Sequence, residues 1–237
     1  MSSPSTPRRT EAAARAPRGR PARLDQARTV ETALELLDEA GLDALTMRRL
    51  ADAMGVQAGA LYRYFATKQN LLTAMAERML AACADPPPTQ EDWTERLAGL
   101  ARRMRTALLG HRDGARVHAG THSTGENTLG FADTLVGTLR EAGFTADDAA
   151  RAAYAIVHFT IGHTLEEQAA LPHGANDAAA DVESLRKALA QGHFPHLTAA
   201  AHVLTSTDFA AHFEYGLRLL IGGLREESTR LRARPTT

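Results

Sequence analysis

Two groups of residues in this 237-residue chain carry side chains that could do chemistry. In the first, residues 46–68, guanidinium, amide and phenol groups alternate with small residues, a mixture suited to contact with phosphates and base edges. In the second, His118, His122 and Glu166 carry atoms that can ligate a metal ion. The sequence contains no Glu-x-x-His pair and no phosphate-cradling glycine loop. A metal-dependent helical-bundle enzyme is therefore the remote alternative, and nucleic-acid binding is the leading hypothesis.

The first group must be positioned by two short helices. We expect one helix over residues 47–54, capped by Thr46, and another over residues 58–64, with Gly55 making the turn between them. This is the pattern of a helix-turn-helix, whose second helix enters the major groove of DNA. Spacing alone is equally compatible with a structural helical hairpin. The outer residues, too polar or too large to bury together, favour DNA binding.

Helical periodicity continues along the whole chain. In a first helix, which Asp25 can cap and Gly41 can end, apolar residues recur at i, i+3, i+4 and i+7. A fourth helix starts near Lys68, and the Asp-Pro-Pro-Pro sequence at 85–88 cannot continue it. Beyond that break we expect helices at 90–109, 112–119, 126–142, 146–170, 180–190, 196–204 and 207–230. Because no alternating strand pattern occurs, the predicted fold is all-α.

The chain divides into four predicted parts. Residues 1–23, rich in Arg, Ser, Pro and Ala, form a disordered basic arm. Residues 24–70 form the helix-turn-helix domain, and residues 71–88 form a connecting helix and linker. Residues 89–237 form a second helical domain.

Charge and composition restrict the class of protein. The net charge of −1 conceals two halves, because residues 1–70 carry 11 basic and 8 acidic groups and the remainder carries 16 and 20. A basic N-terminal half suits DNA. No apolar run approaches the roughly 20 residues of a membrane span, and a single cysteine, Cys83, excludes an internal disulfide framework. We therefore expect a cytoplasmic protein that does not contact membranes.

Residues 24–72 resemble the DNA-binding domain of the tetracycline-repressor (TetR) family. The resemblance rests on the segments GLDALTMR at 41–48, LADAMGV at 50–56 and LYRYF at 61–65, followed by Lys68. It implies that the third helix reads DNA and the fourth leads to a ligand-binding, dimer-forming domain. The positions it assigns to phosphate contact are Thr46, Arg48, Tyr62 and Lys68. Those it assigns to the base-reading side are Gln57, Ala58, Gly59, Ala60, Arg63 and Tyr64.

The C-terminal half resembles the effector and dimerisation domain of the family's tetracycline-responsive members. The similar segments are Arg112–Thr121, His158–Gln168 and Phe209–Leu224. The resemblance implies a pocket in which His118 and Glu166 hold Mg²⁺ together with the effector, the carboxylate acting through water. From the residues alone, each of the two could equally be a hydrogen-bonded or solvated side chain. The candidate effector-binding residues are Leu100, Met104, His118, Thr121, Thr134, Leu135, Phe159, His163 and Glu166.

Three departures from the family pattern bear on the effector. Ala84, Leu100 and Thr134 stand where the tetracycline-responsive members have a His, an Asn and a Gln that contact the drug rings. Apolar replacements leave polar ligand groups without partners, which is costly. We therefore expect a small hydrophobic or polycyclic effector other than tetracycline.

The resemblance and the need to read two half-sites imply a homodimer bound to a palindromic operator in double-stranded DNA. The leading hypothesis is a ligand-responsive transcriptional repressor. An activator and a metal-independent sensor of the same family are the alternatives.

Overall fold

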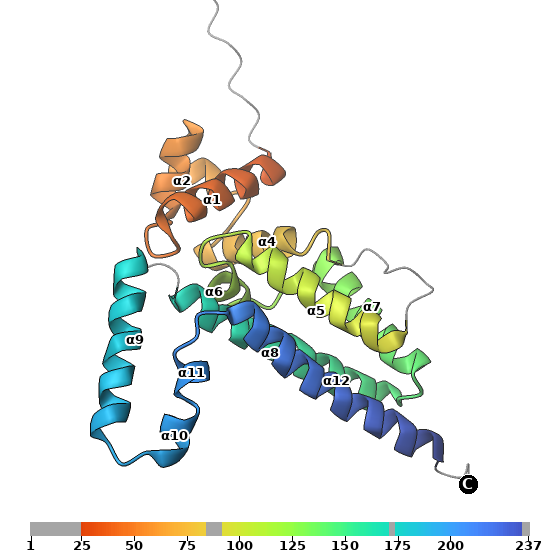
Figure 1. The fold of residues 1–237 in the computed structure, drawn as a ribbon. Coiled ribbons are helices and arrows are strands. Elements are labelled where there is room, and N and C mark those ends of the chain that lie inside the picture. Colours follow the sequence, from red (N-terminus) through yellow and green to blue (C-terminus); the bar gives the residue numbers. More distant parts are fainter. Residues whose placement is uncertain (1–24, 84–91, 171–173, 234–237) are drawn as a thin grey trace, which may run out of the picture.

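The computed structural model describes residues 25–83, 92–170 and 174–233, and in this part of the chain all regular structure is helical (Figure 1). The predicted arm at 1–23 and the predicted break at 85–88 lie outside these residues. The helices are α1 (Gln26–Ala40), α2 (Met47–Met54), α3 (Ala58–Leu61), α4 (Lys68–Met79), α5 (Trp93–Leu109), α6 (Gly114–Ala119), α7 (Glu126–Glu141), α8 (Ala146–Ala170), α9 (Gly174–Gln191), α10 (Pro195–Ala199), α11 (Ala201–Leu204) and α12 (Phe209–Ala233).

The first two helices begin and end where the sequence predicts. The Asp25 carboxylate accepts a hydrogen bond from the Ala27 amide at the start of α1, and the Thr46 hydroxyl accepts one from the Arg49 amide at the start of α2. Gly55 ends α2 in the left-handed conformation, with φ of 65°. The expected second helix of the motif is shorter than predicted, because α3 ends at Leu61 and residues 62–64 form a turn.

The later helices also differ from the prediction at their ends. α5 begins at Trp93 after the Asp92 cap, and α6 begins at Gly114 rather than at residue 112. The helix expected at 180–190 extends over Gly174–Gln191, and the one expected at 196–204 is two short helices interrupted at Ala200. Helix boundaries depend on caps and tertiary contacts, so periodicity locates helix centres better than ends.

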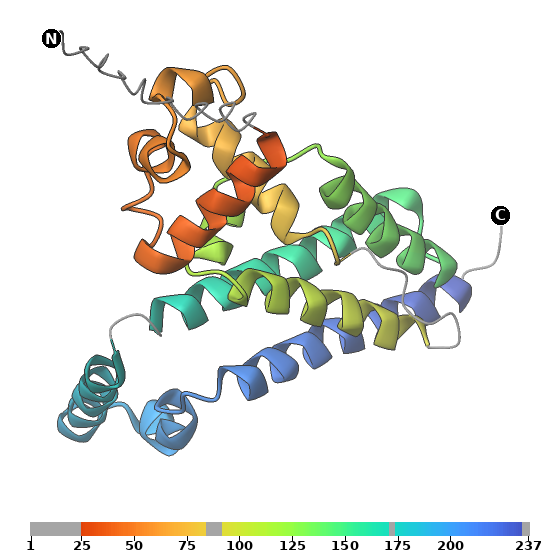
Figure 2. The same cartoon turned by 90° about the horizontal axis from the view of Figure 1, so that it is seen from above.

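α4 connects the predicted helix-turn-helix domain with the helical bundle behind it. Its buried side chains, among them Leu71, Met75 and Met79, belong to one apolar core that runs from Val30 in α1 to Ile221 in α12. Seen from above, α4 passes beneath α1 towards the bundle of α5, α7, α8 and α12 (Figure 2). The two predicted domains therefore share a core through α4.

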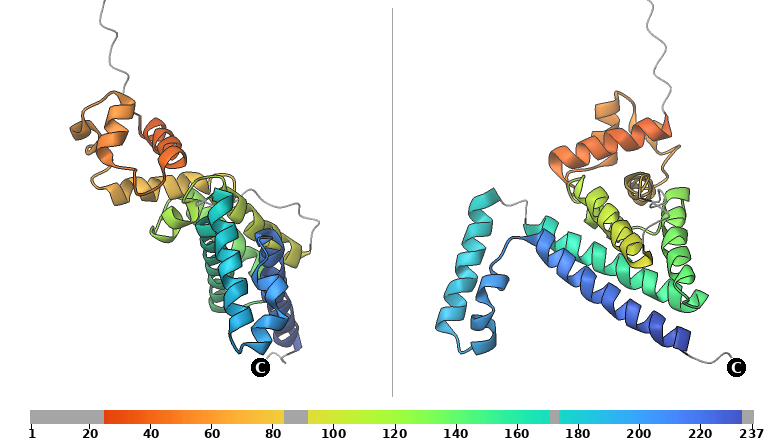
Figure 3. Two further views of the ribbon diagram at one scale, coloured as in Figure 1. Left: turned by 60° about the vertical axis from the view of Figure 1, so that its left-hand side comes forward. Right: turned by 45° about the vertical axis from the view of Figure 1, so that its right-hand side comes forward.

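Helices α9, α10 and α11 stand away from this bundle as a projecting arm (Figure 3). Exposed apolar residues along the arm include Leu185, Phe194, Leu197, Val203 and Leu204. No helix among the described residues combines the length and the hydropathy needed to cross a membrane.

A polar seam joins the predicted helix-turn-helix domain to α6. We define the interdomain seam as residues 38–43 on one side and residues 111–116 on the other. The Leu42 amide donates to the Asp113 carboxylate at 2.8 Å, next to Gly41, whose φ of 80° and ψ of 170° only glycine adopts without strain. A Cβ atom at Gly41 would lie 3.0 Å from the Asp113 carboxylate and 3.1 Å from the Arg112 guanidinium. The close contact between residues 41–42 and residues 112–113 therefore requires glycine at position 41.

We expect Gly41→Ala to destabilise the protein more than Gly55→Ala. Both residues have positive φ, but a Cβ atom at Gly55 meets open space, so that variant carries only left-handed strain of about 1 kcal/mol. Gly41→Ala adds displacement of Asp113 and Arg112, and we expect a loss of up to about 3 kcal/mol. Urea unfolding of the two variants measures the difference, and equal losses would contradict the seam's dependence on Gly41.

Candidate nucleic-acid interface and effector site

The ten predicted DNA-contacting residues lie together on the surface formed by α2, α3, the following turn and the start of α4. Seven are exposed: Thr46, Arg48, Gln57, Gly59, Tyr62, Arg63 and Tyr64. The other three, Ala58, Ala60 and Lys68, are half-buried. This candidate nucleic-acid interface is at the end of the molecule opposite the C-terminus of α12 (Figure 1).

The turn after α3 presents three large side chains to solvent. Leu61 and Phe65 are buried on either side of it, and the Phe65 and Tyr64 amides both donate to the Leu61 carbonyl at 2.9 Å. These anchors leave Tyr62, Arg63 and Tyr64 pointing outwards. The Gln57 side chain makes no capping hydrogen bond at the start of α3, so its amide stays available for a base edge.

The start of α4 is more occupied than the sequence indicates. Thr67 and Asn70 form a reciprocal capping box, which already satisfies the Asn70 amide. The Lys68 ammonium donates to the Leu42 carbonyl at 3.3 Å. Lys68 therefore supports the interdomain seam, in addition to its predicted phosphate contact.

The predicted apolar effector residues lie in the bundle core. Leu100, Met104 and Leu135 are fully buried, and the Phe159 ring stacks on Phe213 with centroids 5.4 Å apart. The hydroxyl groups of the two threonines in the predicted set are already hydrogen-bonded to nearby carbonyls. Thr134 donates to the Gly130 carbonyl at 2.8 Å and Thr121 to the His118 carbonyl at 2.9 Å. The predicted effector residues therefore form a mainly apolar group, and few of their polar atoms are free to hydrogen-bond to a ligand.

Two histidines of this set keep buried nitrogens without a hydrogen-bond partner among the described residues, His163 at Nδ1 and His118 at both ring nitrogens. Burial lowers the pKa of His118, which keeps the imidazole neutral near neutral pH. A neutral imidazole can donate one hydrogen bond and accept another. Its unpartnered nitrogens therefore mark a place where a polar ligand group would be favourable.

Glu166 is exposed on α8, whereas its neighbour Glu167 is buried. The Glu167 carboxylate pairs with the Arg105 guanidinium through two contacts of 2.7 and 2.9 Å, and it lies 4.0 Å from His163. Burial lowers the pKa of His163, and the nearby Glu167 charge opposes that shift. The stripe of Ile156, Thr160 and Thr164, buried four residues apart, would have pointed to Glu167 as the inward carboxylate.

The predicted magnesium ligands are His118 and Glu166, with water and the effector completing the set. Mg²⁺ prefers several oxygen ligands in octahedral geometry, but His118 offers nitrogen and Glu166 faces solvent. Among the described residues, no three His, Cys, Asp or Glu side chains gather closely enough to hold a metal ion. The Mg²⁺ set of His118 and Glu166 stays a prediction.

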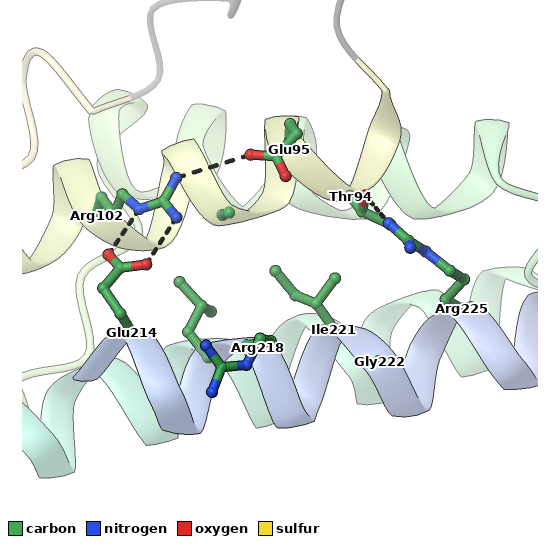
Figure 4. A pocket seen from close by; sticks show the side chains of 10 residues that line it. Thr94, Glu95, Arg102, Glu214, Arg218, Ile221, Gly222 and Arg225 are labelled. Atoms are coloured by element: carbon green, nitrogen blue, oxygen red, sulfur yellow. Dashed lines mark hydrogen bonds and ion pairs between the residues drawn. The ribbon is translucent and has the colours of Figure 1, made fainter. Parts of the chain in front are cut away.

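A cavity that sequence reasoning did not predict lies between α5 and α12, with a volume of about 420 Å³ (Figure 4). Arg102 pairs with Glu214 across it, and Arg225 donates to the Thr94 hydroxyl at 2.8 Å. The hydrogen bonds from Arg102 lower the pKa of Glu214. These pairs close the two ends of the cavity and join α5 to α12.

The interdomain seam brings together further residues that the sequence analysis did not select. The Arg116 guanidinium contacts both oxygens of Asp43 at 2.8 and 3.1 Å, and the His111 ring contacts Asp38 at 3.0 Å. Behind the seam, the Gln168 side chain of α8 donates to the Leu108 and His111 carbonyls and accepts from the Ala115 amide. One short segment therefore contacts both the predicted helix-turn-helix domain and α8.

Comparison with known proteins assigns both halves of the chain. Residues 30–75 match the family model described as bacterial regulatory proteins, tetR family, and residues 85–228 match the model for the tetracyclin repressor-like, C-terminal domain. The chain is 43% identical over 197 residues to the tetracycline repressor protein class A from transposon 1721 of Escherichia coli, an alignment covering 82% of this chain and 88% of the relative.

Two solved structures from Streptomyces coelicolor are similar over most of their length. One, a possible TetR family transcriptional regulator, is 65% identical with a TM-score of 0.78, covering 85% of this chain and 99% of that one. The other, the TetR family protein ActR in complex with (S)-DNPA, is 30% identical with a TM-score of 0.78, covering 87% and 100%.

We expect Glu167→Ala to destabilise the protein and Glu166→Ala to leave its stability almost unchanged. Removing Glu167 leaves the largely buried Arg105 unpaired, so the free energy of unfolding falls by about 3 kcal/mol. Glu166→Ala changes an exposed residue and stays within about 0.5 kcal/mol of the parent. Urea unfolding checks both variants, and similar losses would show that the Arg105 pair does not stabilise the bundle.

Proposed function

The chain belongs to the TetR family of bacterial regulatory proteins, and we propose that it represses transcription as a homodimer on a palindromic operator. In this proposal a small hydrophobic or polycyclic effector releases the operator. The family consists of transcriptional regulators with a DNA-binding and a ligand-binding domain, not of enzymes. Three features of this chain bear on the proposal: the effector site, its connection to the DNA-reading helices and the dimer.

The observation that carries the effector proposal is His118 with its two unpartnered buried nitrogens. A buried polar group without a hydrogen bond costs about 1–3 kcal/mol. An effector that hydrogen-bonds to the ring recovers this cost. The other predicted effector residues include Leu100, Met104 and Leu135, which are apolar and buried and suit a ligand with a large hydrophobic body.

The same short helix connects this site to the DNA-reading helices. α6 carries His118 near its end and Arg116 two residues earlier, and Arg116 contacts Asp43 in the interdomain seam. An effector that shifts α6 through His118 therefore acts on the loop before α2. Because coupling is reciprocal, operator binding must weaken effector binding by the same factor.

Exposed apolar surface on the two longest helices supports the homodimer. Tyr154 on α8 is 65% exposed, and Tyr215 and Leu219 on α12 are 57% and 59% exposed. Gly162 and Gly222 lie on these helices with open space where a Cβ atom would be, which allows close helix approach. We propose that α8 and α12 pack against the same helices of a second copy, and that the partner also covers the apolar residues of the projecting arm.

The effector proposed here is not tetracycline. Leu100 offers no hydrogen bond, and the Thr134 hydroxyl is already bonded to the Gly130 carbonyl, so the polar edge of tetracycline would lack partners. The ActR complex shows that a relative with 30% identity binds a different small molecule, (S)-DNPA. A flatter, less polar polycyclic compound fits these surroundings better.

We expect Arg63→Ala and Arg48→Ala to weaken DNA binding in different ways. Arg63 lies in the turn on the base-reading side, so its removal relaxes sequence preference and costs about 1–3 kcal/mol on the preferred duplex. Arg48, which is assigned to phosphate contact, should affect all duplexes alike and reduce the salt dependence of binding. Fluorescence anisotropy against a duplex selected from a random library measures both. If no salt-sensitive specific duplex is selected, the proposed function is wrong.

We expect His118→Leu to stabilise the protein and to abolish effector release. Removing two unpartnered nitrogens raises the free energy of unfolding by about 1 kcal/mol or more. The difference in the free energy of unfolding between this variant and the parent grows below about pH 6.5. In that range His118 of the unfolded parent gains a proton, whereas the buried ring of the folded parent, with its lowered pKa, stays neutral. Thermal unfolding at several pH values tests this.

Release of the selected duplex from the protein is measured by fluorescence anisotropy with a panel of polycyclic aromatic compounds. Tetracycline is included with and without Mg²⁺. The control is His122→Leu, which replaces an exposed histidine and should change neither stability nor release. Normal release by His118→Leu would contradict the proposed role of the ring. Release of the parent protein by tetracycline would overturn the argument from Leu100 and Thr134.

A further inference from the structure

Helix α7 is capped by a side chain from another helix. Its N-cap residue, Gly125, has no side chain, and the Glu77 carboxylate of α4 takes its place. That carboxylate accepts from the Asn127 and Thr128 amides at 2.5 and 3.1 Å, and from the Thr128 and Ser123 hydroxyls at 2.6 and 2.9 Å. The two free amides and the dipole at the start of α7 are thus satisfied by a charge that belongs to α4.

The two partners are matched in shape and charge. A Cβ atom at Gly125 would lie 2.3 Å from the Glu77 carboxyl carbon, so only glycine leaves room for the carboxylate. Burial by itself raises the pKa of Glu77, but the hydrogen bonds from Thr128, Asn127 and Ser123 outweigh it and lower that pKa. Asn127 adds a bond from its side chain to the Glu77 carbonyl at 3.1 Å. The site is therefore built around an ionised Glu77.

Glu77 also occupies a particular place on α4. It lies nine residues after Lys68, or about 13 Å along the helix axis, from the candidate nucleic-acid interface. Near the other end of α4, the Gln69 side chain donates to the Gly120 carbonyl at 2.7 Å. Both ends of α4 are thus bonded to the segment 120–128, which directly follows α6.

We propose that Glu77 is a positioning residue that fixes the orientation of α4, and with it the DNA-reading helices, on the effector domain. Because the cap is shared, the first turn of α7 and the direction of α4 are ordered together. A rearrangement of the segment after α6 therefore weakens the α7 cap and frees the orientation of α4. The inference rests on the proposed function for its consequence at the operator, but the coupling between α4 and α7 stands independently of DNA.

The alternative is that Glu77 only stabilises α7. A double variant distinguishes the two roles. Gly125 has φ of −74° and ψ of 167°, which suits an ordinary N-cap residue. Once Glu77 is removed, the aspartate introduced by Gly125→Asp has room to cap α7 from within its own helix. Glu77→Ala combined with Gly125→Asp therefore restores the cap without restoring the connection to α4.

The experiment compares the full-length parent, Glu77→Ala and the double variant Glu77→Ala/Gly125→Asp. Thermal unfolding reports the α7 cap, and hydrogen exchange of α4 together with anisotropy on the selected duplex report its positioning. We expect the double variant to recover most of the lost thermal stability. We expect α4 to exchange faster in both variants, and the affinity for the duplex to stay about tenfold below that of the parent.

Recovery of α4 protection and of affinity along with stability would show that Glu77 is a structural cap only and would overturn the proposal. Unchanged α4 exchange in Glu77→Ala would overturn it as well. If the parent selects no duplex, the proposed function fails, whereas the exchange comparison still decides the role of Glu77.

Discussion

The structure depends on one close contact, the hydrogen bond from the Leu42 amide to the Asp113 carboxylate beside Gly41. Among the described residues, helices α1 to α3 pack against the rest of the molecule mainly through α4. Their orientation is therefore set by what they contact behind them. Asp113 itself adopts a positive φ of 58°, which Asp tolerates better than most residues, so the backbone on both sides of the contact is specialised for it.

A second connection between the two domains lies near the C-terminal end of α4, where Glu77 caps α7. The seam holds the loop before α2, and the Glu77 cap holds the C-terminal half of α4. Between them runs the segment from α6 to the start of α7, which also carries His118. A family regulator must convert a small rearrangement at its effector site into a displaced reading surface, and packed elements do so by moving between discrete arrangements. Here one short stretch, residues 111–128, contains His118 of the candidate effector site, one side of the interdomain seam and the residues capped by Glu77.

Much of the fold could be predicted from sequence, because caps and periodicity are local signals. Asp25, Thr46 and Gly55 act at the helix ends where the sequence places them. α3 was predicted too long because its end is set by burial of Leu61 and Phe65, which turns the chain outwards. The all-α architecture and the grouping of the predicted DNA-contacting residues on one surface followed from the same local pattern and from the family resemblance.

The effector half could be predicted less well, because its decisive contacts join residues far apart in the chain. The family resemblance indicates Glu166, which is exposed on α8, but it does not indicate Glu167, which α8 buries against Arg105. The shared cap of Glu77 and α7 spans about fifty residues and leaves only an uncapped glycine as a sign in the sequence. Long-range polar pairing of this kind requires the packed structure.

We propose that the seam between residues 38–43 and 111–116 transmits conformational changes between the DNA-binding domain and the effector domain. Hydrogen exchange of the whole protein, with and without a saturating selected duplex, tests it most directly. We expect slower exchange on DNA binding at residues 47–64 and also at residues 38–43 and 111–116, because fixing the reading helices stabilises what they contact. Protection confined to residues 47–64, with the seam unchanged, would contradict it.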